Sequence, residues 1–233
     1  MGEQHSVAIK SFGWDTIKYI PYRIFPVLFG FIGLWVYTRI FPPADYGTYT
    51  LINTTIILAN IFAYTWIDES NLRFYTNFKN SGRLDVYFST SFMMLTGVLA
   101  AISLLIVALS WLSILPGAVS SYLVLIVIEV IALSFFEILL TLLRADRKAV
   151  EASFYRTVSA VFILVVSLIC IFVFNLGIAS ILLGFIITDG VLSLVIILRN
   201  GYLKYIHIKS FSVDTLKDYA TYGLPLMVTS TFS

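Results

Sequence analysis

Two acidic residues stand inside long apolar segments of the sequence. Glu129 lies ten residues into the run 119–143, and Asp189 lies eleven residues into the run 178–198. At a helical rise of about 1.5 Å per residue, both carboxyl groups would lie roughly 15 Å deep in a membrane. Because a carboxyl group at that depth needs a cavity, a partner or an ion, we expect these residues to bind a coupling proton or sodium ion. Hydrogen bonding to a neighbouring helix is the alternative.

Two neighbouring features bear on this expectation. Gly190 follows Asp189 directly, and a glycine can let a helix unwind beside a bound ion or let two helices pack closely. Glu137 lies nearer the end of its apolar run, where a carboxylate can reach water or pair with Arg144.

A second set of polar residues occurs in the apolar run 46–67. Asn53, Asn60 and Tyr64 are spaced seven and four residues apart, which places them on one face of a helix. A polar stripe in a membrane helix must face protein or water. It could line a hydrophilic lumen and contact sugar hydroxyl groups, or it could form hydrogen bonds between helices.

Arg23 lies near the start of the first apolar run. An arginine there can extend to lipid headgroups, or its planar guanidinium can donate two hydrogen bonds to phosphate oxygens. Residues for catalysis are not predicted, because the sequence has no glycine-rich phosphate loop, zinc-type histidine pair or nucleophile elbow. The two histidines are isolated, and a single cysteine, Cys170, supports neither a disulfide nor a thiolate metal site within the chain.

The elements that carry these residues are predicted to be membrane-spanning helices. Hydrophobic residues make up 59% of the 233 residues and charged residues only 12%, and the mean hydropathy is +0.94. Because backbone amides in lipid must be paired within their own segment, long apolar runs without strand alternation predict an all-α polytopic membrane protein. The six runs are 21–41, 46–67, 86–112, 119–143, 154–175 and 178–198.

The basic residues predict the orientation of these helices. Of the 15 lysines and arginines, all but Arg39 fall in or beside alternate connections, whereas the intervening connections are short and turn-like. The positive-inside rule therefore predicts a cytoplasmic amino terminus in a cytoplasmic membrane. A formal charge of only +2, with no basic stripe, excludes nucleic acid as an expected partner.

A polar stretch follows the sixth run and leads into a further apolar segment around Pro225. Asp15-Thr16-Ile17-Lys18 precedes Pro26 as Asp214-Thr215-Leu216-Lys217 precedes Pro225, with both prolines 11 positions after the aspartate. This echo predicts parallel repeats. We expect a six-helix lobe at 1–199, then a cytoplasmic linker and the start of a seventh helix and second lobe at 200–233.

Four segments carry a family resemblance: Pro42-Pro43-Ala44-Asp45-Tyr46-Gly47-Thr48-Tyr49, Ser70-Asn71-Leu72-Arg73-Phe74-Tyr75, Leu142-Leu143-Arg144-Ala145-Asp146-Arg147-Lys148 and Tyr222-Gly223-Leu224-Pro225-Leu226. In order and spacing they resemble the polysaccharide biosynthesis and oligosaccharide flippases of the multidrug/oligosaccharidyl-lipid/polysaccharide exporter (MOP) superfamily.

This resemblance implies two six-helix lobes around a central cavity, which move polyprenyl-diphosphate-linked oligosaccharide across the membrane by alternating access. Arg23 and Arg73 would then attract the diphosphate at the cytoplasmic entrance. Glycan polymerases and glycosyltransferases of the same pathway would be partners. Two alternatives stay open: a cation-coupled multidrug exporter of the same superfamily, favoured by an acidic cavity, and a non-transporting membrane scaffold or assembly subunit, favoured by a tightly packed lumen.

Overall fold

The computed structural model describes the backbone of residues 24–231 and the side chains of residues 24–227. This range contains an apolar helix, Ile24–Ile40, and five longer helices that could each cross a membrane. No strand occurs among the described residues. The predicted all-α, six-helix membrane fold is thus confirmed. The five longer helices are α2 (Pro43–Asn80), α3 (Leu84–Trp111), α5 (Leu123–Ala145), α6 (Ala149–Phe174) and α7 (Ala179–Asn200).

Helix α2 is longer than its apolar run indicates. It begins at Pro43, where a proline costs no hydrogen bond because the first turn has no intrahelical acceptor. It continues well past Ile67, because the polar residues there contain no glycine or proline to stop a helix. The chain turns at Gly82, which has a φ of +69° that glycine adopts without steric cost.

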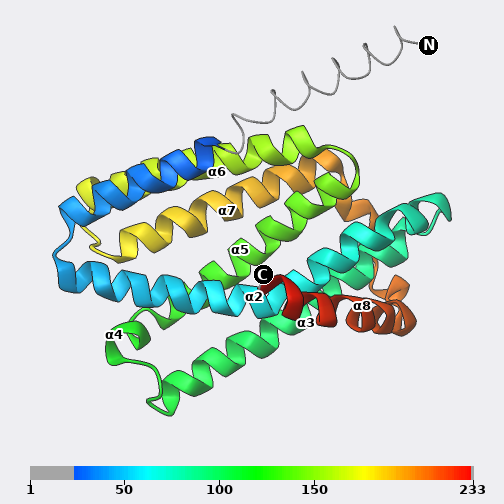
Figure 1. Cartoon of the computed structure of the whole chain (residues 1–233), viewed down its shortest axis with the longest axis horizontal. Coiled ribbons are helices and arrows are strands. Elements are labelled where there is room, and N and C mark those ends of the chain that lie inside the picture. Colours follow the sequence, from blue (N-terminus) through cyan, green and yellow to red (C-terminus); the bar gives the residue numbers. More distant parts are fainter. Residues whose placement is uncertain (1–23, 232–233) are drawn as a thin grey trace, which may run out of the picture.

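The helices form one bundle whose outer surface is apolar. Helix α7 packs against both α5 and α6, and α2 packs against α3 and α5. The helix Ile24–Ile40 lies along α6 in Figure 1. Large apolar side chains such as Leu104, Trp111 and Phe172 are exposed on the outside of the bundle. Lipid tails would cover these residues without cost, as a membrane-embedded bundle requires.

The connections gather at two opposite ends of the bundle (Figure 1). One end, here called the basic end, contains the connections 81–83, 146–148 and 201–212. The other end contains the connections 41–42, 112–122 and 175–178, the second of which includes the short helix α4 (Gly117–Ser120). Successive helices therefore run antiparallel, as the alternation of basic and short connections predicts.

The connection 201–212 is fixed to α3 by side-chain hydrogen bonds. Ser89 donates to the carbonyl oxygen of Tyr205 at 3.1 Å and accepts from the backbone N–H of His207 at 2.8 Å. Ser210 donates to Asp85 at 2.9 Å. The two short 3₁₀ turns of this connection leave some backbone groups without helical hydrogen bonds, and the side-chain bonds to α3 satisfy several of them. The connection therefore has a defined conformation. The turns are η1 (Tyr202–Tyr205) and η2 (Ile208–Ser210).

Helix α8 (Val213–Thr231) follows this connection and packs against α2. Ser70 on α2 donates a hydrogen bond to the carbonyl oxygen of Tyr219 at 3.0 Å. The backbones approach so closely at Gly223 that an added Cβ would lie 2.8 Å from the carbonyl carbon of Trp66. The start of the predicted seventh helix is therefore present, and it packs against α2.

Candidate functional site

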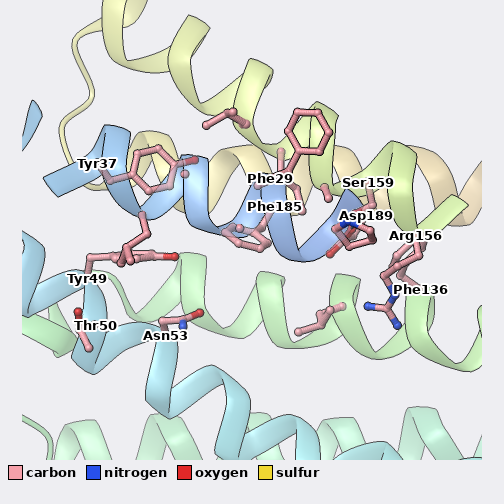
Figure 2. A pocket seen from close by; sticks show the side chains of 18 of the residues that line it. Phe29, Tyr37, Tyr49, Thr50, Asn53, Phe136, Arg156, Ser159, Phe185 and Asp189 are labelled. Atoms are coloured by element: carbon pink, nitrogen blue, oxygen red, sulfur yellow. Dashed lines mark hydrogen bonds between the residues drawn. The ribbon is translucent and has the colours of Figure 1, made fainter. Parts of the chain in front are cut away.

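A cavity of about 420 Å³ lies inside the bundle (Figure 2). Its wall is contributed by the helix Ile24–Ile40 and by α2, α5, α6 and α7. Most of the wall is apolar or aromatic, including Phe29, Phe136 and Phe185. Gly30 and Gly33 on the first of these helices also line it, and their missing side chains leave room for the cavity. The volume falls in the range of small-molecule binding sites.

The polar side chains of the cavity lie at two separate places. In Figure 2, Ser159, Asp189 and Arg156 are together at one end, whereas Tyr37, Tyr49, Thr50 and Asn53 are at the other. Aromatic rings occupy the space between them. A ligand inside the cavity would thus meet polar groups at its two ends and an apolar surface along its middle.

Asp189 lies halfway along α7 and is 1% exposed. Ser159 on α6 donates a hydrogen bond to its Oδ1 at 2.8 Å. No salt bridge to Asp189 is found between residues 24 and 227. A carboxylate in this position has one hydroxyl donor to offset its desolvation, so the charged form needs a further cation or must take up a proton.

Arg156 enters the cavity one helical turn before Ser159 on α6 and forms an ion pair with Glu137 on α5. Both terminal guanidinium nitrogens of Arg156 donate to the two carboxylate oxygens of Glu137. The Glu137 side chain is 9% exposed, but that of Arg156 is 41% exposed. Arg156 is one of the residues that line the cavity, and its guanidinium carbon lies 5.8 Å from the ring centroid of Phe136 on α5.

Of the two alternatives for Glu137, the pairing with Arg144 is wrong. Arg144 lies further toward the basic end, where it donates to Thr141 at 2.5 Å and lies 3.8 Å from Asp68 on α2. Glu137 instead pairs with a residue of the adjacent helix α6. The reason is geometric: Arg144 is two turns beyond Glu137 on the same helix, too far for the direct contact that Arg156 makes across the interface.

Arg156 is the site residue that sequence reasoning missed. It stands at the start of the apolar run 154–175, where the sequence groups it with the basic connection that precedes this run. Helix α6 begins at Ala149, however, so Arg156 lies about two turns inside it. The number of residues between the Arg144–Lys148 segment and Arg156 could have indicated this position. A helix that begins directly after that segment places Arg156 inside the bundle at the level of Glu137.

Glu129 on α5 is 2% exposed and does not line the cavity. Its Oε2 has no hydrogen-bond partner among the described residues. An uncharged carboxyl group is the form that such surroundings favour. Glu129 thus resembles Asp189 in its burial and differs from it in having no access to the cavity.

The three predicted residues on α2 have different surroundings. Asn53 lines the cavity. Asn60 is buried, accepts a hydrogen bond from Ser134 on α5 at 2.6 Å and donates to the carbonyl oxygen of Ile56. Tyr64 is partly buried and packs against the core. The spacing that put them on one helical face therefore brings one to the cavity and leaves the other two in helix packing.

The predicted arginine Arg73 lies apart from this cavity. Arg73 is exposed near the basic end of α2, with its guanidinium carbon 4.1 Å from the ring centroid of Tyr222 on α8. Arg23 falls outside the described residues. Among the residues that the structure describes, no group of three or more His, Cys, Asp or Glu side chains could hold a metal ion.

Gly190 is not a packing glycine. A Cβ added there would meet nothing within 4 Å, and α7 is continuous through Asp189 and Gly190. The close contact is made by Gly184 instead, where an added Cβ would lie 2.9 Å from the carbonyl oxygen of Ile163 on α6. Gly184 thus allows α6 and α7 to approach, and this approach brings Ser159 to Asp189.

A charged network ties three helices together at the basic end. Asp146 accepts from Tyr75 at 2.7 Å and from Lys79 at 2.6 Å, and Lys148 lies 3.1 Å away. Partial burial alone would raise the pKa of Asp146, but the hydrogen bonds from Lys79, Tyr75 and Lys148 outweigh it and lower this pKa below its usual value. Lys148 also donates to Asn200 at the end of α7.

These features define a polytopic α-helical membrane protein with a largely apolar cavity between its helices, lined by one buried acid and by the arginine of an ion pair. Residues 15–233 match the family described as polysaccharide biosynthesis protein, and the chain belongs to that family. A search of curated protein sequences finds no match.

Solved membrane transporters share this fold. A MATE transporter in its straight conformation is 19% identical, with a TM-score of 0.72 over 92% of this chain and 51% of its own. A MOP superfamily transporter from Pyrococcus furiosus, described by the reverse polarity of its binding pocket, is 19% identical with a TM-score of 0.71 over 91% and 50%. An outward-facing multidrug resistance MATE transporter is 18% identical with the same TM-score and coverage. The chain spans about half the length of each, and the resemblance to the MOP superfamily fold is confirmed.

Proposed function

We propose that this chain forms the first lobe of a membrane transporter that flips polyprenyl-diphosphate-linked oligosaccharide across the cytoplasmic membrane by alternating access. The observation that carries the proposal is the family match, which runs through residues 15–233 and concerns polysaccharide biosynthesis. The fold supports transport, because it is the fold of one half of solved MOP superfamily transporters. In this proposal the amino terminus is cytoplasmic and the basic end is the cytoplasmic face.

The site residues take distinct roles in this mechanism. Asp189 couples transport to an ion gradient, since it is a buried acid with access to the cavity. Arg73 attracts the diphosphate at the cytoplasmic entrance, as does Arg23. Asn53, at the far end of the cavity, offers an amide to a polar group of the substrate. Glycosyltransferases that build the glycolipid and a polymerase that consumes it would be functional partners.

The coupling role of Asp189 can be tested by glycolipid delivery. In cells whose only copy of the transporter carries Asp189→Asn, we expect lipid-linked oligosaccharide to accumulate in the cytoplasmic leaflet, because the variant has no titratable group at this point of the cavity. Asp45→Asn is the matched control, since Asp45 is an exposed aspartate in the first turn of α2. Normal outer-leaflet delivery by Asp189→Asn at normal protein abundance would remove Asp189 from the mechanism.

A second candidate function is cation-coupled multidrug export. Two observations favour it: an acid within an aromatic cavity suits an organic cation, and one of the similar folds is a multidrug resistance transporter. A strain that lacks the protein would then become drug-sensitive and would keep normal glycolipid delivery. The scaffold alternative is less well supported, because tight packing would leave no cavity of about 420 Å³.

A further inference from the structure

Two large apolar side chains are exposed on the connection 201–212 at the basic end. Leu203 in η1 is 57% exposed, and Ile208 in η2 is 80% exposed. Each is followed directly by a lysine, Lys204 or Lys209, whose side chain is also exposed. The connection contains no acidic residue, and neither lysine forms a salt bridge among the described residues. This surface segment therefore presents two pairs of one apolar and one cationic side chain.

The hydrogen bonds to α3 place this connection at the depth of the lipid headgroups. Trp111 at the other end of α3 is 85% exposed, which is typical of aromatic residues at a membrane interface. Crossing roughly 30 Å of hydrocarbon takes about 20 helical residues, so a span counted back from Trp111 ends at Phe92. Ser89, which bonds to the connection, lies about 5 Å further along the helix. Since the headgroup layer is roughly 5–8 Å thick, the connection falls within it.

The backbone of the connection fits a headgroup layer and not the hydrocarbon. Ile206 and Phe211, which follow the two 3₁₀ turns, are extended. The backbone N–H of Ser212 donates to the hydroxyl oxygen of Thr90 on α3 at 3.2 Å. Irregular backbone of this kind is excluded from lipid tails, because amides without helical partners are costly there. Water and phosphate oxygens in the headgroup layer can bind such amides.

The exposed side chains suit the same layer. Leu203 and Ile208 would stay hydrated in bulk water, and they gain free energy when they reach the boundary of the acyl chains. A lysine can lay its aliphatic stem along that boundary and hold its ammonium group among the phosphates. Lys204 and Lys209 stand next to the two apolar residues in the sequence, so each pair can use both parts of the layer.

A second part of the protein is the other surface that could cover these residues. Lysine is depleted at protein interfaces, however, and is enriched where a segment lies on an anionic membrane. We propose that the connection 201–212 is an interfacial segment that binds anionic phospholipid headgroups through Lys204 and Lys209, with Leu203 and Ile208 inserted beneath them. The lipid would then hold the segment from which α8 starts.

The depth of the connection can be measured with a nitroxide spin label at position 208. The full-length variant Ile208→Cys carries the label in a Cys170→Ser background, since Cys170 is buried in the bundle. Collision rates with oxygen and with a water-soluble relaxant report the depth. In vesicles of phosphatidylcholine with an equal part of phosphatidylglycerol, we expect the label in the headgroup layer. Asn80→Cys, at the exposed tip of the α2–α3 hairpin, is the control and should report water.

The role of the lysines is tested by titrating phosphatidylglycerol into phosphatidylcholine vesicles. We expect the label at position 208 to move inward as the anionic fraction rises. Lys209→Gln should need about fivefold more phosphatidylglycerol for the same change, which corresponds to the attraction of one lysine to an anionic surface. Lys209→Arg retains the charge and should match the native residue. Arg83→Gln removes an exposed cation at the hairpin tip and should leave the titration unchanged.

Three results would overturn the proposal. The first is a label at position 208 that stays in water. The second is a depth that is equal with and without phosphatidylglycerol, or that Lys209→Gln leaves unaltered. The third is a label that is already shielded in detergent micelles without phospholipid, because another part of the protein would then cover this surface. The measurement uses no oligosaccharide, and both leaflets of the vesicles have one composition, so its outcome is independent of transport and of orientation.

Discussion

The side chains of Asn60 and Ser134 form a hydrogen bond that joins α2 to α5. Ser134→Ala removes the donor to Asn60, and we expect the free energy of unfolding to fall by about 0.6 kcal/mol and at most about 1.7 kcal/mol, the range for hydrogen bonds between membrane helices. Unfolding in mixed micelles measures this change. Ser103→Ala is the control, because the Ser103 hydroxyl is buried without a hydrogen-bond partner in the described part of the chain. Unchanged stability with reduced transport would instead place Asn60 in contact with the substrate.

The contribution of Asp146 to the stability of the fold is expected to depend on pH. Its pKa is lowered in the folded protein, so the ionised form stabilises the fold at pH values above about 4, the pKa of an unperturbed aspartate. This contribution is lost as the pH falls through the lower pKa of the folded state. We expect Asp146→Asn to lose at most about 1 kcal/mol at neutral pH, since Lys79 is 52% exposed and solvent screens the pair.

Measurement of unfolding midpoints for the native protein and Asp146→Asn over a range of pH checks this expectation. The difference between the two should be constant near neutral pH and should shrink below about pH 4. A difference that grows on acidification would contradict the assigned direction of the pKa shift.

The sequence predicted the buried acids better than their partners. Asp189 and Glu129 could be located from their depth in apolar runs, because a charge is conspicuous against an apolar background. The ion pair of Glu137 with Arg156 could not, because it joins two helices and depends on their relative axial position, which side-chain packing sets. The same dependence explains why Asn53, Asn60 and Tyr64, evenly spaced on one helix, have three different surroundings.

Gly184 and Gly190 on α7 allow two roles of a helical glycine to be tested separately, namely close helix packing and helix unwinding. Gly184→Ala should weaken the contact of α7 with α6, because the added methyl group meets the backbone of Ile163, which cannot move aside. A loss of about 1–3 kcal/mol in unfolding free energy is expected. Because the same contact brings Ser159 to Asp189, the variant should also reduce glycolipid delivery.

Gly190→Ala is the matched control on the same helix, where the added methyl group enters open space. Its stability should be equal to that of the native protein or higher by up to about 1 kcal/mol, since alanine is the better helix former. Impaired transport with unchanged stability in Gly190→Ala would show that α7 does unwind at this position during the transport cycle.

At the scale of elements, hydropathy predicted which segments are helices but not where some of them end. The apolar run identifies only the part of α2 that lipid would surround, and the helix then continues to Asn80. The connection 201–212 was expected as a linker, and nothing in its composition indicated the hydrogen bonds to Ser89 and Asp85 on α3. Such bonds depend on where two remote segments meet.

At the scale of the whole molecule, the docking of α8 on α2 determines where a second lobe would start. Tyr219 and Tyr222 of α8 pack against Phe74 of α2, and Arg73 covers the ring of Tyr222. Close backbone approach at Gly223 fixes the same interface. In the proposed two-lobe transporter, a rearrangement between lobes would therefore either carry α8 along with α2 or break these contacts.

Arg73 lies at this junction, and its substitution tests the substrate class of the whole transporter. In the proposed flippase, the planar guanidinium of Arg73 at the cytoplasmic entrance donates two hydrogen bonds to the diphosphate. We therefore expect Arg73→Ala to reduce delivery of the glycolipid to the outer leaflet by about tenfold, equivalent to about 1.4 kcal/mol of binding. Arg73→Lys retains the charge without the planar fork and should have an intermediate effect. Arg39→Ala is the matched control, because Arg39 also stacks on an aromatic ring, that of Trp35, near the opposite end of the bundle. Outer-leaflet glycolipid is measured at equal protein abundance. Equal losses in Arg73→Ala and Arg39→Ala would attribute the effect to lost packing against the aromatic rings. No loss in either variant would show that Arg73 does not contact the diphosphate.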